Sequence, residues 1–281
     1  MSLWIEFKVM QQKEHLTIRQ WLADFYMSKS NMYKFEVHRG IKLNNILVKL
    51  DVEISLNDIL SFDFSIIAST SVLPSNHTIH IVYEDEDFLV VNKEVGLLVH
   101  GDGTQSDTLT HRVAYYMMQK NYPYPVLPVH RIDTVTSGMV VFAKHPLALS
   151  YMSAIFERRE VLKKYVCMVE GLVRQDRMTI QHSIGKHRHE NKQMISPTGK
   201  NALTTIKVIS REISKSRVEA MIEGGRKHQI RVHLASVGHP VVGDVLYGGR
   251  RDKRVHLHFC FIKFIHPRTF ESIEIDCPTP F

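Results

Sequence analysis

The segment HRIDTVTSGMVVFAK, residues 130 to 144, places one carboxylate where it could do chemistry. Asp133 follows Arg131 by two positions and precedes small polar residues that lead into an apolar stretch. A polar turn at the end of a buried strand can hold a carboxylate rigidly, which favours catalysis. An isolated aspartate in such a turn more often hydrogen-bonds its own backbone, so this segment alone establishes no function.

Three further segments combine polar residues with apolar runs: VVNKEVGLLVHG (90–101), Lys163-Lys164-Tyr165, and GGRKHQIRVHLASVGHPVVGDVLYGG (224–249). Together with HRIDTVTSGMVVFAK they cover most of residues 79 to 250. In composition and order they resemble the four motifs of the pseudouridine synthases that act on ribosomal and transfer RNA, often called the RluA type. The resemblance implies a mixed, mainly antiparallel sheet with an active-site cleft across its centre.

The resemblance also implies roles for four residues. Asp133 matches the essential aspartate of the family, and Arg231 matches a basic residue that pairs with it. Tyr165 matches a tyrosine that stacks on the target base and is implicated in handling the proton at carbon 5. Arg131 matches an arginine that helps to expel the target nucleotide from the RNA stack. Outside these motifs, a helical arginine is usually solvated and a strand tyrosine is usually part of the core.

Rebuilding a uridine within RNA explains these residue types. The nucleotide must be unstacked, at a cost on the order of a few kcal/mol, and held in a pocket by groups such as an arginine and an aromatic ring. Asp133 could attack the sugar or the base, or could remove a sugar proton, and a nearby arginine would keep it ionised for each role. We expect no cofactor, because reactant and product are isomers. We expect no metal, because His182, His187 and His189 lack a carboxylate or cysteine at a recognisable spacing.

The chain departs from the family pattern near these motifs. Glu94 stands where the family usually has proline, and Lys227 replaces a small hydroxyl residue. Thr134 and Val135 replace charged residues that usually follow the aspartate. We expect all of these positions to lie beside the cleft and to affect which RNA site is modified more than the chemistry.

The distribution of charge indicates where an anionic partner binds. The net charge is +7, with a pI near 9.2. Residues 1 to 75 contain eight Lys plus Arg and eight Asp plus Glu, so residues 76 to 281, with 28 against 21, carry the whole excess. We therefore expect RNA to bind the larger C-terminal part. We expect two basic stretches to form loops that contact RNA phosphates, together with Lys227. The first contains Lys186, His187, Arg188, His189 and Lys192, and the second contains Arg250, Arg251, Lys253 and Arg254.

The apolar pattern predicts an α+β protein with two domains, residues 1–75 and 76–281. The first has a helix within Leu16–Met27 and short strands between Ile41 and Phe64. It faintly resembles an S4-like RNA-binding module, although its zero net charge also suits a packing module. The turn-rich stretch Ser69–Asn76 reads as the linker.

The larger domain shows more strands than helices. Strands are predicted at 79–83, 88–92, 139–143, 164–169, 203–209 and 217–222. Helices are predicted from an Asp107 cap to Gln119, from Pro146 onward, and at 229–237. Such long runs favour an antiparallel sheet over a regular βαβ array.

Composition narrows the protein class. No apolar run approaches the ~20 residues of a membrane span, and no secretory peptide is readable, so we expect a cytosolic protein. Cys167, Cys260 and Cys277 are far apart, which indicates reduced thiols. We expect a monomer. Two other functions stay open: a non-catalytic RNA-binding or ribosome-assembly protein of the same fold, and a metal-dependent nuclease.

Overall fold

A computed structural model describes residues 4–68 and 72–281, so the predicted linker at 69–76 lies partly outside the described residues. The described chain forms a four-stranded sheet near the N-terminus and an eleven-stranded sheet in the remainder. Each sheet has its own large apolar core. None of the described helices is long and apolar enough to cross a membrane.

The N-terminal unit, residues 4–68, packs two helices on a small antiparallel sheet with strand order β1-β4-β2-β3. Its core is aromatic, and Trp21 stacks on Phe62 with the ring centroids 5.7 Å apart. The predicted helix is shorter than expected and begins with a capping box between Thr17 and Gln20. The elements are β1 (Trp4–Lys8), α1 (Ile18–Asp24), α2 (Lys29–Val37), β2 (Ile41–Leu43), β3 (Ile46–Leu47) and β4 (Ile59–Asp63).

The large sheet follows the order β11-β10-β12-β13-β9-β14-β8-β6-β5, with β15 paired to β14 and β7 to β8. All of its described pairings are antiparallel except β8 with β14, which confirms the predicted mainly antiparallel α+β fold. Its strands are β5 (His80–Glu84), β6 (Phe88–Lys93), β7 (Leu127–Pro128), β8 (Ser137–Ala143), β9 (Leu162–Glu170), β10 (Arg177–Lys186), β11 (Gln193–Ile195), β12 (Lys200–Arg211), β13 (Lys215–Glu223), β14 (Leu257–Ile265) and β15 (Ser272–Asp276).

Three helices accompany this sheet: α3 (Leu109–Gln119), α4 (Pro146–Glu157) and α5 (Gln229–Ser236). The predicted cap of α3 was wrong by one residue. Thr108, not Asp107, caps this helix, because the Thr108 hydroxyl accepts the backbone N–H of His111. Asp107 instead pairs with Arg112, with an Nη2–Oδ2 distance of 2.8 Å.

The parallel pairing of β8 with β14 brings the two halves of the large sheet together where the Asp133 segment ends. Gly138 in β8 has a φ of +114°, and a Cβ there would lie 2.4 Å from the carbonyl oxygen of Phe259. Only glycine allows this conformation and this approach. The glycine that follows Thr136 and Ser137 therefore fixes where the loop before β8 meets the second half of the sheet.

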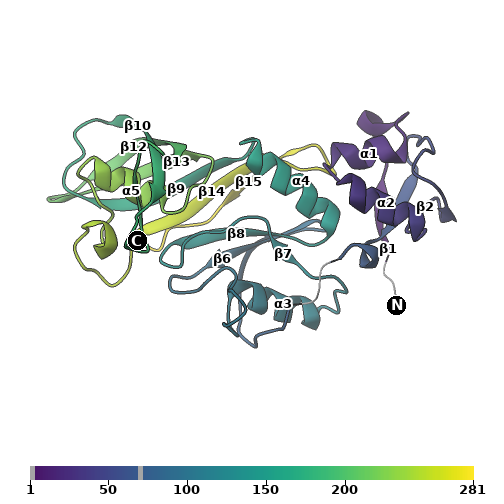
Figure 1. Ribbon diagram of the computed structural model, residues 1–281, viewed down its shortest axis with the longest axis horizontal. Coiled ribbons are helices and arrows are strands. Elements are labelled where there is room, and N and C mark those ends of the chain that lie inside the picture. Colours follow the sequence, from purple (N-terminus) through teal and green to yellow (C-terminus); the bar gives the residue numbers. More distant parts are fainter. Residues whose placement is uncertain (1–3, 69–71) are drawn as a thin grey trace.

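The N-terminal unit and α5 lie at opposite ends of the molecule (Figure 1). Helix α4 lies between them, along the sheet. Leu147 of α4 and Tyr124 are buried in the aromatic core of the N-terminal unit. The unit is therefore packed on the large sheet, at a distance from the segment around α5.

Candidate active site

A pocket of about 300 Å³ opens where the loop before β8 faces the N-terminal end of α5. Its volume is at the lower end of the range for small-molecule sites. The side chains that line it include five predicted site residues: Arg131, Asp133, Tyr165, Lys227 and Arg231. The fold thus gathers residues from three separated motifs around one cavity, which we call the Asp133 pocket.

Arg231 connects Asp133 to a buried acid. Its Nη1 lies 3.3 Å from Oδ2 of Asp133, while its Nε and Nη2 donate to the two carboxylate oxygens of Asp244 at 2.6 and 2.8 Å. Burial lowers the pKa of Arg231, but its pairing with Asp244 and Asp133 outweighs burial, and the pKa is raised overall. The arginine is therefore a fixed, permanent cation beside Asp133 and not a solvated helix residue.

The two oxygens of Asp133 have different surroundings. Oδ2 faces Arg231 and also His228, whose Nε2 lies 3.9 Å away. Within residues 4–68 and 72–281, no hydrogen bond reaches Oδ1. The side chain is 25% exposed and lines the pocket. One oxygen is held while the other stays available for a ligand, which is the arrangement that a nucleophile or base requires.

His228 was not predicted as a neighbour of Asp133. Its backbone adopts a left-handed conformation with φ 57°, immediately before α5, and its Nδ1 lies 2.8 Å from the hydroxyl of Tyr247. That hydroxyl accepts the backbone N–H of Gln193, so its own proton is available for Nδ1. Burial lowers the pKa of His228 despite the nearby Asp133 carboxylate. The neutral ring therefore presents Nε2–H toward Asp133.

Lys93 is a second residue that the sequence did not single out. It is fully buried at the end of β6, and its Nζ donates to the carbonyl oxygens of Glu94, Leu97 and Thr134 at 2.7, 2.8 and 3.3 Å. Burial lowers its pKa to about 8, although the negative charge of Asp133 acts in the opposite direction. The lysine ties the loop after β6 to the residue that follows Asp133.

Tyr165 in β9 contributes an aromatic wall to the pocket. It is 8% exposed, and its ring stacks on Phe259 with centroids 4.6 Å apart and planes inclined by 14°. Burial, followed by the Asp133 charge, raises the pKa of the phenol. Tyr165 is therefore a neutral phenol at physiological pH.

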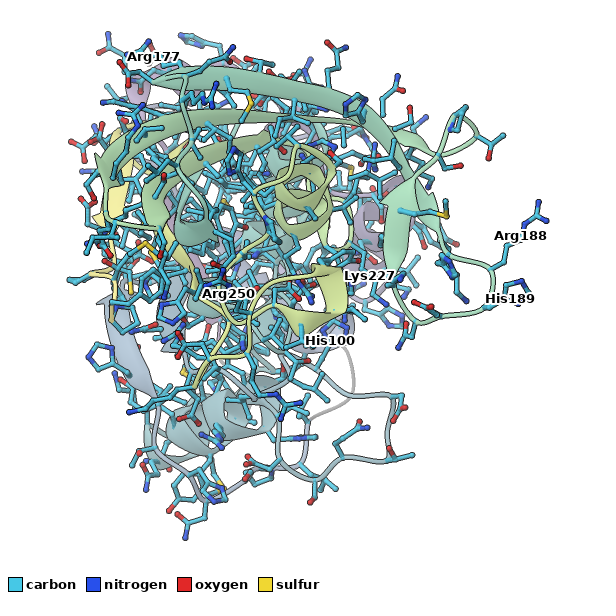
Figure 2. All side chains as sticks on the ribbon, turned by 90° about the vertical axis from the view of Figure 1, so that its left-hand side faces the viewer. His100, Arg177, Arg188, His189, Lys227 and Arg250 are labelled. Carbon is cyan, nitrogen blue, oxygen red and sulfur yellow. The ribbon has the colours of Figure 1, made fainter. Side chains whose placement is uncertain are left out.

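The remaining basic residues differ in their distance from the pocket. Arg131 is exposed and lies 3.4 Å from Nε2 of His100, and Lys227 donates to Oδ1 of Asn191 at 3.1 Å. Figure 2 shows Lys227 and Arg250 near the middle of the α5 end, whereas Arg188 and His189 extend away from them on the β10–β11 hairpin. Lys186, Arg188, Arg250 and Arg251 are exposed but do not line the pocket.

Three sequence expectations need correction here. Lys186 belongs to β10 and not to a loop. Arg254 does lie in the predicted loop, but it is not solvated, because it is partly buried and donates to the hydroxyl of Ser137. Glu94 lies away from the Asp133 pocket and pairs with Arg112 at 2.7 Å, because its loop turns to the other side of the Asp133 segment. Among the altered positions, Lys227 does line the pocket.

The described residues offer no evident metal-binding site. Across the described ranges, no group of three or more His, Cys, Asp or Glu residues is arranged to hold a metal ion. The three cysteines are free thiols.

Comparisons with known proteins identify the family of the chain. The sequence profile described as RNA pseudouridylate synthase matches residues 87–236. The uncharacterized RNA pseudouridine synthase YhcT of Bacillus subtilis (strain 168) is 36% identical over 259 residues, which cover 90% of this chain and 86% of the relative. Ribosomal large subunit pseudouridine synthase D of Vibrio cholerae is 35% identical over 221 residues, which cover 72% of this chain and 68% of the relative.

A solved structure gives the same result. Human RNA Pseudouridylate Synthase Domain Containing 1 superposes with a TM-score of 0.64 at 30% sequence identity, covering 74% of this chain and 86% of that one. The chain therefore belongs to the RNA pseudouridine synthase family, of the RluA type, and is an isomerase that forms pseudouridine in RNA.

Proposed function

We propose that this enzyme isomerises specific uridines in ribosomal or transfer RNA, with Asp133 as its catalytic carboxylate. The observation that carries the proposal is the asymmetry of that carboxylate, with Oδ2 held by Arg231 and Oδ1 open to the Asp133 pocket. Relatives named for the ribosomal large subunit favour ribosomal RNA as the first substrate to test.

The reaction moves one bond within the nucleotide. The bond between N1 and the sugar breaks, the base turns, and carbon 5 joins the sugar. Carbon 5 then loses its proton, and N1 gains one, so the product is an isomer of the reactant. An ionised Asp133 can attack the sugar or the base, or can remove a sugar proton. In each case Arg231, held by Asp244, keeps the carboxylate oriented, because both residues are buried and paired.

The other residues of the pocket suit binding of an extruded uridine. Arg131 at the mouth supplies a cation that can occupy the gap in the RNA stack, and Tyr165 supplies an aromatic surface inside. Because its pKa is raised, Tyr165 suits stacking and hydrogen-bond donation better than accepting the proton of carbon 5. Exposed cations around the pocket would hold the RNA backbone: Lys227, Lys186, Arg188, Arg250 and Arg251.

The proposal also covers the N-terminal unit, the oligomeric state and the location of the protein. The N-terminal unit is an S4-like module whose zero net charge favours packing over RNA binding. One complete pocket per chain supports a monomer, and an RNA substrate with free thiols in the chain supports a cytoplasmic location.

The test follows hydrogen leaving carbon 5. RNA labelled with tritium at that carbon, from cells that lack this protein, is incubated with wild type and with Asp133→Asn. We expect release by wild type, none above background by Asp133→Asn, and RNA of unchanged length. Asp176→Asn, at an aspartate whose side chain is 85% exposed, is the matched control and should release tritium normally.

Binding of the same RNA must be measured in parallel. Intact binding without release by Asp133→Asn supports the catalytic role. Release by Asp133→Asn at the wild-type rate would mean that another residue is the catalytic group. Failure of wild type on both RNA classes, with binding intact, would favour the non-catalytic RNA-binding hypothesis, which the comparisons do not support.

A further inference from the structure

A second pocket, of about 530 Å³, lies on the other side of the segment that carries Asp133. It shares no lining residue with the Asp133 pocket. Its walls include Ile79 before β5, Leu109 at the start of α3, and Ser137 at the start of β8. Its volume is within the range of small-ligand sites and exceeds what a bare inorganic ion needs. The proposed reaction leaves this cavity unused.

Arg254 gives this second pocket an unbalanced positive charge. The side chain is partly buried, donates from Nη2 to Ser137, and donates from Nε to its neighbouring carbonyl at Val255, 3.2 Å away. Over the described parts of the chain, no carboxylate lies within ion-pair distance of Arg254, and its Nη1 has no hydrogen-bond partner. Arg231 and Arg268, by contrast, each pair with a buried aspartate.

Lys93 in the lining adds to the positive potential. Burial, assisted by the charge of Arg254, lowers the pKa of Lys93 to about 8. The same two causes lower the pKa of His258, which also lines the cavity, to about 4, so that ring is neutral. Glu94 is the carboxylate of this lining, and Arg112 holds it at 2.7 Å. Same-sign groups brought together beside an empty volume are stabilised by an anion.

We propose that the second pocket binds the phosphate group of a nucleotide, with Arg254 as its principal ligand. The guanidinium group has a planar set of donors that matches phosphate oxygens. The apolar residues Ile79, Leu97 and Leu109 give the attached sugar or base a surface on which to pack. The nucleotide is either one of the RNA substrate, away from the target uridine, or a free nucleotide; both present the same phosphate.

The position of this pocket links it to the catalytic segment. Lys93 lines the second pocket and donates to the carbonyl of Thr134, and Ser137 accepts from Arg254 and belongs to the segment that follows Asp133. A nucleotide bound there would lie beside Ser137 and beside Lys93, which is hydrogen-bonded to Thr134 at the other end of residues 134–137. The site therefore combines phosphate recognition with support of the loop that holds the carboxylate.

The first test measures the melting temperature with increasing uridine monophosphate at constant ionic strength. We compare wild type, Arg254→Gln and Arg177→Gln, the last changing an exposed arginine at the end of β10 labelled in Figure 2. If the site takes a free nucleotide, wild type and Arg177→Gln gain stability with a shared Kd. Arg254→Gln then needs at least 10-fold more ligand for the same shift.

The second test uses RNA and needs no catalysis. The logarithm of RNA affinity is plotted against the logarithm of salt concentration, where each lost phosphate contact reduces the slope by about one. If the phosphate belongs to the RNA, Arg254→Gln lowers the slope by about one and Arg177→Gln does not. Both tests measure binding and not catalysis. Their outcome is therefore independent of the catalytic role proposed for Asp133.

A third pair of variants keeps the proposal testable if Arg254→Gln does not fold. Val95→Glu adds a carboxylate at the mouth of the second pocket, and Val37→Glu adds the same charge on α2; both valines are exposed. Val95→Glu, but not Val37→Glu, should weaken binding of the nucleotide or of RNA, as Arg254→Gln does. Equal responses of the variants and their controls in both tests would overturn the proposal.

Discussion

At the scale of the residue, Asp133 is oriented by Arg231, and Arg231 is held in turn by an aspartate that Asp133 does not contact. Asp244 is 1% exposed, and its two bonds to Arg231 fix the plane of the guanidinium group. The same group then offers Nη1 to Asp133. A carboxylate beside such a cation is oriented before the reaction and needs no reorganisation during it.

His130, three residues before Asp133, predicts how acid destabilises this segment. Its Nε2 accepts the backbone N–H of Val141, and burial lowers its pKa to about 3. Because the unfolded chain binds the proton more readily, stability is fully present above about pH 6.5 and is lost as pH falls toward 3. Between pH 7 and 5 we expect His130 to contribute a loss of about 1–2 kcal/mol in the free energy of unfolding.

Urea unfolding of His130→Gln checks this expectation, because glutamine keeps an acceptor but does not titrate. The variant should lose less stability than wild type between pH 7 and 5. His189→Gln, which removes an exposed histidine on the hairpin, should retain the full loss. Identical pH dependence of wild type and His130→Gln would contradict the assignment.

The sequence indicated which residues form the site, but not which of them line the Asp133 pocket and which line the second pocket. Asp133, Tyr165 and Arg231 were predicted through their motifs and do meet in one pocket. Asp244, His228 and Lys93 also lie within the four motifs, yet their contacts depend on loops that are far apart in the sequence. Pairing of Arg231 with Asp244 needs the turn that reverses the chain after α5, and local spacing does not determine that turn.

At the scale of the element, the β10–β11 hairpin extends from the α5 end of the sheet (Figure 2). The backbone N–H of His187 donates to the carbonyl of Lys192 at 2.9 Å, and Lys227 contacts Asn191 in this turn. The hairpin thus carries Lys186 and Arg188 beyond the pocket while remaining attached to the loop before α5. Its expected use is to hold RNA backbone at a distance from the reacting base.

The double variant Lys186→Gln/Arg188→Gln tests this role. Loss of two phosphate contacts should reduce the slope of log affinity against log salt by about two and weaken RNA binding. The rate of tritium release at saturating RNA should be unchanged, because neither residue lines the Asp133 pocket. Measurement requires a salt series for binding and single-turnover release at high enzyme concentration.

The opposite end of β10, where it pairs with β12, offers a matched control. Arg177 and Lys207 face each other across β10 and β12, and both are exposed. Arg177→Gln/Lys207→Gln removes the same charge and should leave the slope near that of wild type. Equal slopes for the two double variants would mean that net charge, and not the hairpin, governs RNA binding.

Elements were predictable where apolar residues follow a regular period. Strands β6, β8 and β9 have buried runs, and their approximate ranges were predicted. Strand β10 was missed because Gln181 and His182 interrupt its few buried positions, and α2 was missed because only Met32 and Phe35 are buried. Strand β14 was missed as well, although it is rich in phenylalanine and isoleucine.

At the scale of the whole molecule, Arg268 joins the large domain, where it pairs with a buried aspartate, to the N-terminal unit. Asp87, 1% exposed, accepts from Nε of Arg268 at 3.0 Å and from Nε2 of His145 at 2.7 Å. Arg268 also donates to the carbonyl of Glu6 in β1 at 2.7 Å and lies over the ring of Phe7. Removing one partner of such a pair costs about 3–5 kcal/mol, because the other charge stays buried.

Arg268→Gln should therefore loosen the N-terminal unit before the large sheet unfolds. Both tryptophans, Trp4 and Trp21, belong to the N-terminal unit, so their fluorescence reports that unit alone, whereas far-UV circular dichroism is dominated by the rest of the chain. In wild type the two urea transitions should coincide, as expected for one cooperative structure. In Arg268→Gln the fluorescence midpoint should fall on the order of 1 M or more, and below the dichroism midpoint.

Arg177→Gln, an exposed arginine on β10, is the control and should leave both midpoints unchanged. A common shift of both probes in Arg268→Gln would mean that the apolar contacts of Leu147 and Tyr124 hold the two parts together without the ion pair. Unchanged midpoints would show that Asp87 is satisfied by His145 alone. Separate transitions would establish that Arg268 holds the N-terminal unit against the rest of the chain. This contact lies at the end of the molecule opposite α5, so the N-terminal unit adds stability without contacting the pocket.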